Sequence, residues 1–221
     1  MSTVAEPTYR KRIGYQAGLL GGFATLAAAL LIIGNNSTVE PIAERQAEDL
    51  LQSLSQVIPA RLHDNNLLDN AILIEDDTGQ PLTIYRAMKN QQITGLAYSV
   101  TAQGYAGDIK LLLGLEPDGS LIGVRVLAHA ETPGLGDKIE IEKDSWITSF
   151  NGRSLSNTAA RAWQVKKDGG DFDQFSGATI TPRAIVRAVH AGLQFYAGHR
   201  EELVVITEEK QAKTQDSEIS Q

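Results

Sequence analysis

A run of small and hydroxyl-bearing residues near the C-terminal end of the chain has the types and spacing to accept a covalent group. Residues 176–179 read Ser-Gly-Ala-Thr, and they lie inside a longer loop-like segment, residues 173–182. Gly177 and Ala178 put almost no side-chain bulk beside the hydroxyl of Thr179, and glycine reaches φ values that other residues avoid. Four small residues alone favour a plain loop before a helix, and the same residues also leave the Thr179 hydroxyl accessible to a donor enzyme.

The residues that follow predict the start of a helix. Thr181 and Pro182 have the types of an N-cap and of a first helical position. Residues 183–196 then repeat apolar side chains at helical spacing. A phosphoester on Thr179 would lie close to this helix N-terminus, where unpaired N–H groups and the helix dipole favour an anion.

A second loop, residues 131–136, has the composition of a turn that contacts a ligand. It directly follows a predicted strand and consists of Glu131, Thr132, Pro133, Gly134, Leu135 and Gly136. One proline and two glycines make a stiff loop whose backbone can approach a flat ligand closely, and Thr132 adds a hydroxyl. By itself this loop also fits an ordinary strand exit.

Some further residues are candidates on weaker grounds. His129 beside Glu131 invites a general-base interpretation, but no serine or cysteine nucleophile stands in a recognisable context, so we expect structural or ligand-lining roles for both. Lys166 and Lys167 can supply charge-assisted contacts to a phosphate or can lie in a solvated turn. Tyr105, in the sequence Gly-Tyr-Ala-Gly, fits either a contact with the second loop or a place in the core.

The composition removes several classes of function. The chain has no cysteine, which excludes cysteine-ligated iron–sulfur clusters, c-type haem attachment, disulfides and a lipoprotein anchor. Its four histidines, His63, His129, His190 and His199, lack metal-ligand spacing, so no metal site is expected. With 20 Lys and Arg against 27 Asp and Glu, the net charge is -7, which argues against nucleic acid as a partner.

An uncharged apolar stretch near the N-terminus predicts a membrane-spanning helix. Residues 13–33 carry no charged side chain, and as a helix they span about 31 Å, which matches a bilayer core. A cleaved signal peptide is the alternative, since the three alanines at positions 27–29 resemble a processing site. Strongly apolar residues continue past them to Ile33, which favours the anchor.

The charges around this stretch predict its orientation. Arg10, Lys11 and Arg12 precede it, whereas Asn35 and Glu40 follow it. By the positive-inside rule, residues 1–12 lie in the cytoplasm, and the residues after the span lie on the outer side of the membrane. In a Gram-negative bacterium this means a single-pass protein of the inner membrane with a periplasmic domain, and the lipid bilayer is one of its partners.

The remainder of the chain predicts an α+β domain on a helical stalk. Apolar residues at 3.6-residue spacing predict an amphipathic helix from Pro41 to Ile58, ended by Pro59, within a stalk of residues 34–70. Residues 71–74 form a short apolar piece, and short apolar runs between turn signals predict strands at residues 82–85, 95–101, 109–115 and 121–127. Their short connections favour an antiparallel sheet, flanked by helices at residues 146–150 and 183–196. The domain covers residues 71–207, and residues 208–221 predict a disordered tail.

These features together resemble the G subunit of the Rnf electron-transport complex, a member of the FMN-binding domain family, over residues 10–198. The resemblance implies one FMN per chain, bound as a phosphoester to Thr179, with Ser176, Gly177 and Ala178 beside it. It implies that residues 131–136 border the isoalloxazine and that their backbone N–H groups bond its O2 and O4. It also implies that Asp173 belongs to the signal read by a flavin transferase, and it makes Lys166 a candidate contact of the FMN phosphate.

The same resemblance implies a membrane-anchored electron carrier rather than a stand-alone enzyme. Complexes of this kind move electrons between NADH and ferredoxin, or another low-potential acceptor, and couple the flow to ion translocation. The expected partners are the other subunits of the complex and the flavin transferase. In such a carrier no residue of the chain needs to act as an acid or a base.

Three alternatives stay open from the sequence. The C subunit of a sodium-pumping NADH:quinone oxidoreductase shares the anchor, the loop and the flavin site, although the shorter length and the Thr-Ile-Thr-Pro context favour the Rnf family. A non-redox membrane scaffold would leave both loops unexplained. A free-standing periplasmic flavoprotein fits the loops, but the stalk and anchor favour a fixed partner.

Overall fold

The computed structural model describes residues 13–76 and 78–204. The chain forms two compact units, which divide between Asp49 and Leu50. The predicted cytoplasmic segment, residues 1–12, and the predicted tail, residues 208–221, lie outside the described residues.

The first unit is helical throughout its described residues. They belong to helix α1, Ile13–Val57, which has an exposed apolar span over Ile13–Asn35 with a mean hydropathy of 2.1. This span is long and apolar enough for a single-pass membrane anchor. The helix predicted from Pro41 to Ile58 is confirmed as far as Val57, but its predicted start is wrong, because α1 runs through Pro41 without a break. A proline inside a helix removes one backbone hydrogen bond, and the flanking turns carry the helix past it.

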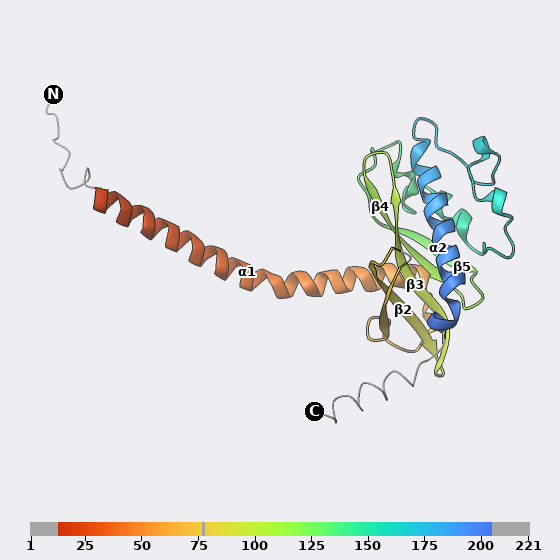
Figure 1. Cartoon of the computed structure of the whole chain (residues 1–221), viewed down its shortest axis with the longest axis horizontal. Coiled ribbons are helices and arrows are strands. Elements are labelled where there is room, and N and C mark those ends of the chain that lie inside the picture. Colours follow the sequence, from red (N-terminus) through yellow and green to blue (C-terminus); the bar gives the residue numbers. More distant parts are fainter. Residues whose placement is uncertain (1–12, 77, 205–221) are drawn as a thin grey trace. The chain divides into compact units, whose positions relative to one another are not determined.

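The second unit contains a five-stranded sheet in the order β1-β2-β3-β4-β5 (Figure 1). All neighbouring strands are antiparallel, so the chain forms a simple meander and the predicted antiparallel α+β fold is confirmed. The strands are β1 (Ala71–Glu75), β2 (Pro81–Lys89), β3 (Gln92–Gln103), β4 (Asp108–Leu115) and β5 (Leu121–Ala128).

After the sheet, the described residues form several short 3-10 helices and one long α-helix. Helix α2, Ile180–Val204, lies along the sheet in Figure 1. Of the short helices, η4 (Ser145–Phe150) matches the helix predicted at 146–150, and the Asp144 carboxylate caps it by accepting the Trp146 N–H. The others are η3 (Asp137–Ile139), η5 (Ala160–Ala162) and η6 (Lys166–Asp168), and η2 (Ala60–Leu62) precedes the sheet.

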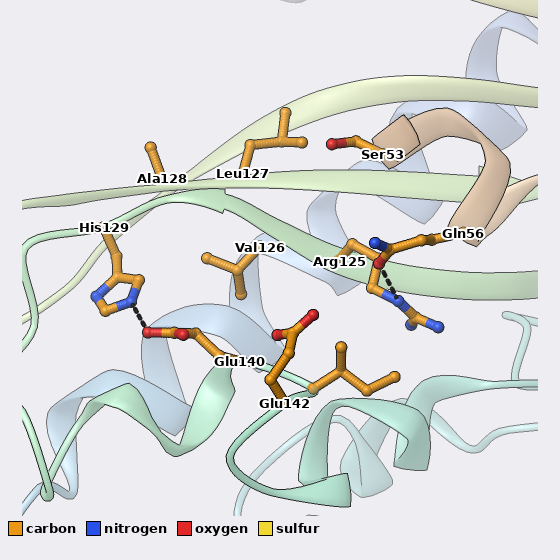
Figure 2. Close-up of a pocket in the computed structure, with 10 residues that line it drawn as sticks. Ser53, Gln56, Arg125, Val126, Leu127, Ala128, His129, Glu140 and Glu142 are labelled. Atoms are coloured by element: carbon orange, nitrogen blue, oxygen red, sulfur yellow. Dashed lines mark hydrogen bonds and ion pairs between the residues drawn. The ribbon is translucent and has the colours of Figure 1, made fainter. Parts of the chain in front are cut away.

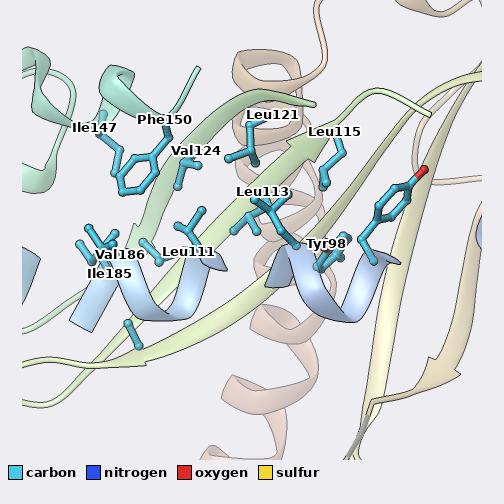
Figure 3. Packing of buried hydrophobic residues seen from close by; sticks show 14 of the residues in the cluster. Tyr98, Leu111, Leu113, Leu115, Leu121, Val124, Ile147, Phe150, Ile185 and Val186 are labelled. Atoms are coloured by element: carbon cyan, nitrogen blue, oxygen red, sulfur yellow. The ribbon is translucent and has the colours of Figure 1, made fainter. Parts of the chain in front are cut away.

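The main core lies between α2 and one face of the sheet. Leu111 and Leu113 of β4 contribute to the cluster that also holds Tyr98 of β3 and Ile185 and Val186 of α2 (Figure 3). Alternate residues of a strand point to opposite faces, so these side chains share the face covered by α2. The Tyr98 hydroxyl donates to the Gly192 carbonyl oxygen at 2.8 Å and ties β3 to the helix.

A second core covers the other face of the same sheet. Leu112 of β4 is buried there with Leu54 and Val57 from the last turns of α1. The two layers approach closely at Gly114, where a Cβ atom would lie 2.4 Å from the Val57 carbonyl oxygen. Because both faces of β4 are buried, this strand reads as an almost continuous apolar run rather than as an alternating one.

Candidate functional site

The two loops singled out in the sequence meet at one cavity of about 370 Å³. A volume in the range of roughly 300–1,000 Å³ is usual for a small-molecule site. Three separate segments form the wall, which is lined by Tyr105, Glu131, Thr132, Leu135, Gly136, Gly177, Ala178, Thr179 and Ile180. Tyr105 thus lies at the cavity with 71% of its surface exposed, which settles the choice between loop contact and core.

A tight turn presents Thr179 to this cavity. The Ala178 N–H donates to the Phe175 carbonyl oxygen at 3.3 Å, and Gly177 has a φ of +83° at the third position of the turn. A positive φ at that position favours glycine, which explains why glycine follows Ser176 in this turn. Phe175 is buried against Trp146, which anchors the start of the turn while Thr179 stays partly exposed.

The loop of residues 131–136 uses its own backbone donors internally. Leu135 and Gly136 donate their N–H groups to the Thr132 carbonyl oxygen, at 3.1 and 3.0 Å. The Gly134 N–H bonds the Asp137 carboxylate and, ahead of Lys143, lowers the pKa of Asp137 below its ordinary value. The expectation that these N–H groups serve a flavin therefore finds no support at the three positions.

The carboxylate of Glu131 joins all three wall segments. One oxygen, Oε1, accepts the N–H groups of Tyr105 and Ala106 at 2.8 and 3.1 Å. The other, Oε2, accepts the Thr181 hydroxyl at 2.5 Å. Glu131 is only 5% exposed and Thr181 is fully buried. This carboxylate is therefore a structural brace within the cavity wall.

The predicted N-cap role of Thr181 is wrong. Helix α2 begins at Ile180, so Thr181 lies inside its first turn and Pro182 follows it there. The Thr181 hydroxyl donates to a buried carboxylate, Glu131, instead of accepting a backbone N–H at the helix end. A hydrogen bond to a charged group is worth more than one between neutral groups, and this tertiary partner overrides the local pattern.

His129 holds the start of the 131–136 loop through a hydrogen bond to Glu131. Its Nδ1 accepts the Glu131 N–H at 3.0 Å, which places the ring proton on Nε2, and Nε2 donates to Glu140 Oε1 at 2.7 Å. Lys143 and, to a smaller extent, His129 lower the pKa of Glu140 below its ordinary value. With both ring nitrogens engaged in this way, His129 has a structural role.

Several residues proposed from the sequence lie away from the cavity wall. Pro133, Gly134 and Ser176 are exposed on the two loops and do not line it. Lys166 forms an ion pair with Asp173, the residue expected to belong to the flavinylation signal, with Nζ and Oδ1 2.6 Å apart. Both side chains are more than half exposed.

A second cavity, of about 350 Å³, is lined by His129 (Figure 2). Its polar wall includes the His129–Glu140 pair, and Arg125 donates through Nε to Gln56 Oε1 at 3.0 Å. Neither residues 131–136 nor residues 176–179 line it. The sequence motifs therefore belong to the first cavity alone.

A family model agrees with the place of the first cavity, and one solved structure is similar to the chain. A family model for an FMN-binding domain matches residues 104–194, which include every residue that lines the first cavity. Among solved structures, NqrC of Shewanella oneidensis is similar with 21% identity and a TM-score of 0.45, over 65% of this chain and 72% of that one.

Curated relatives cover most of the chain. The G subunit of the ion-translocating oxidoreductase complex of Cereibacter sphaeroides is 48% identical over 186 residues, 84% of this chain and 85% of the relative. The corresponding G subunit of Stutzerimonas stutzeri is 45% identical over 190 residues, 86% of this chain and 83% of the relative. The resemblance drawn from the sequence is thereby confirmed, ahead of the quinone-reductase alternative. The chain belongs to the family of G subunits of Rnf-type ion-translocating oxidoreductase complexes and contains their FMN-binding domain.

Proposed function

We propose that the first cavity holds one FMN whose phosphate is esterified to the Thr179 hydroxyl, and that the chain relays electrons within its complex. The observation that carries the proposal is the meeting of the Thr179 turn and the 131–136 loop around one cavity inside the FMN-binding domain. Bound FMN supplies reversible electron transfer.

The residues of the cavity fit such a group. Tyr105, Leu135 and Ile180 present exposed apolar surface at the wall, which suits the faces of a flat ring. Thr132 is exposed at the same wall, and we assign it a hydrogen bond to the ring edge. Lys166 keeps Asp173 as its partner, so we leave it out of the contacts to the phosphate.

The position of Thr179 suits a phosphodiester. It immediately precedes helix α2, a helix of 25 residues, and the N-terminus of a helix favours an anion through its unpaired N–H groups and its dipole. In the attachment step the Thr179 Oγ–H bond breaks and an Oγ–P bond forms. The pyrophosphate bridge of the donor, flavin adenine dinucleotide, breaks, and AMP and one proton leave.

The setting of the domain completes the proposal. Residues 13–33 anchor the chain in the inner membrane, and residues 34–70 connect this anchor to a periplasmic domain of residues 71–207. The three basic residues that precede the apolar span support a cytoplasmic N-terminus. The partners are the other subunits of the complex, a flavin transferase and the bilayer, and the electrons pass between NADH and ferredoxin or another low-potential acceptor while ions are translocated.

A matched pair of variants tests the covalent bond. The full-length chain is co-expressed with a flavin transferase, denatured, separated on a gel and viewed under ultraviolet light. We expect the wild type and Ser176→Ala to fluoresce and Thr179→Ala to be dark, because Ser176 lies in the same turn but outside the cavity wall. Fluorescence that survives in Thr179→Ala, or a dark wild type, would contradict the assignment.

A further inference from the structure

The strongest feature that the relay itself does not use is the buried carboxylate of Glu131. It accepts three hydrogen bonds, from the N–H groups of Tyr105 and Ala106 and from the hydroxyl of Thr181. These donors lie 26, 25 and 50 residues away in the sequence, on two other segments. A single side chain thus connects all three segments that build the cavity wall.

Gly104 and Gly136 lie against the Glu131 carboxylate so closely that neither position has space for a Cβ atom. A Cβ atom on Gly104 would lie 2.3 Å from Glu131 Oε1, and one on Gly136 would lie 2.7 Å from Oε2 and 3.2 Å from the Thr181 hydroxyl oxygen. Gly104 also donates its N–H to the Gly107 carbonyl oxygen at 2.9 Å, which turns the 104–107 loop toward the carboxylate. The segments that form the cavity wall therefore pack closely against the Glu131 carboxylate.

The hydrogen bond between Glu131 and Thr181 holds the chain close to Thr179, the proposed flavin acceptor. Thr181 lies two residues after Thr179, in the first turn of α2. Without an acceptor, the Thr181 hydroxyl and the two N–H groups would be left unpaired inside the wall, which proteins avoid by moving the chain or admitting water. Any such movement shifts the start of α2 and, with it, the turn that carries Thr179.

We propose that Glu131 is a positioning residue that sets the Thr179 hydroxyl for flavin attachment by fixing the start of α2 against residues 105 and 106. The inference rests on the proposed function, since it concerns the same threonine. Glu131 acts through geometry, and its negative charge is dispensable for attachment.

Glutamine separates geometry from charge at this position. Its amide oxygen accepts the N–H groups of Tyr105 and Ala106, and its NH2 group donates to the Thr181 oxygen, which has lone pairs to accept it. Glu131→Gln therefore rebuilds all three contacts, whereas Glu131→Ala removes all three. Thr181→Val removes only the contact to the helix.

The experiment measures the rate of flavin attachment to each full-length variant by a flavin transferase with flavin adenine dinucleotide as donor, together with the melting temperature before attachment. A misplacement of about 1 Å can slow a reaction roughly a hundredfold, so we expect Glu131→Ala and Thr181→Val to react at least about tenfold more slowly. Glu131→Gln is expected to react within about twofold of the wild type. Tyr98→Phe, which loosens α2 at Gly192 instead of at the cavity, controls for general destabilisation and is expected to react normally.

The outcomes separate this inference from the proposed function. If the wild type gains no flavin at Thr179, the proposed function fails. If the wild type is labelled and Thr181→Val is labelled equally fast, the positioning role fails while the proposed function stands. If Glu131→Gln is as slow as Thr181→Val, geometry is not what Glu131 supplies, and the inference is overturned. Because Glu131→Gln and Thr181→Val change the wall least, they decide the matter even if Glu131→Ala does not fold.

Discussion

Replacing Gly136 by alanine tests whether the wall of the first cavity is as tightly packed as the structure indicates. The new Cβ would lie 2.7 Å from Glu131 Oε2, 2.9 Å from Glu131 Cβ and 3.2 Å from the Thr181 hydroxyl oxygen. The carboxylate oxygen can swing away, but the Glu131 Cβ moves only with its backbone. That backbone is held by the Glu131 N–H bond to His129 Nδ1.

The cost of this substitution follows from two ways of relieving the contact. If the loop shifts, the cost is that of overpacking, about 1–3 kcal/mol. If Glu131 rotates instead, it gives up a hydrogen bond to a charged group, about 1.5–3 kcal/mol. Either way we expect Gly136→Ala to lose about 1–3 kcal/mol, which lowers the melting temperature by roughly 2–12 °C for a domain of this size.

The two tryptophans of the chain provide the assay. Trp146 and Trp163 are both buried in the second unit, so their fluorescence reports the unfolding of the detergent-solubilised full-length chain. Gly198→Ala is the control, because Gly198 lies within α2 with open space around it. There alanine is expected to stabilise by about 0.5–1 kcal/mol. A Gly136→Ala protein that melts within about 1 °C of the wild type would refute the reasoning.

Two further predictions concern α2. Tyr98→Phe removes the buried bond to the Gly192 carbonyl oxygen and is expected to cost about 0.5–1.5 kcal/mol in urea unfolding, whereas an unchanged midpoint would show that this bond adds nothing. The Arg183 guanidinium, which bonds the Asp168 carboxylate through two nitrogens, lowers the pKa of Asp168 below its ordinary value of 3.8. A carboxyl group whose pKa is lowered in the folded protein contributes stability above its ordinary pKa, and this contribution is lost as the pH falls through the lowered pKa. The wild type should therefore melt at a higher temperature than Asp168→Asn at about pH 6. The two melting temperatures should converge as the pH falls below 3.8. A gap that does not change with pH would contradict the ion pair.

The sheet could be predicted from the sequence, but the ends of its strands could not. Strands predicted at residues 82–85 and 95–101 extend to Pro81–Lys89 and Gln92–Gln103 in the structure. They are joined by a two-residue turn at Asn90 and Gln91, both with positive φ. Such turns are normally marked by glycine, and a glutamine there gives no signal, so the hairpin is longer than its pattern suggests.

The site was predictable where the chemistry is local. The Gly177 turn and the stiffness of residues 131–136 follow from residue types and their spacing. The bond between Glu131 and Thr181 does not, because the two residues stand 50 positions apart and the Thr-Pro pair has the local pattern of a helix cap. Likewise, His129 gains its role from Glu140, 11 residues away, at a distance in sequence that no short motif covers.

The order of the elements along the chain fixes when the proposed flavin acceptor, Thr179, takes shape during synthesis. All five strands have been made once Ala128 is reached, yet α2, which covers their apolar face, ends at Val204. At roughly 5–20 residues per second, making the residues in between takes about 4–15 seconds. Until then the sheet face that holds Leu111 and Leu113 lacks its cover. Thr179 immediately precedes the same helix, so the proposed acceptor is among the last parts of the domain to reach its final position, and a transferase that recognises the folded site would act late in synthesis.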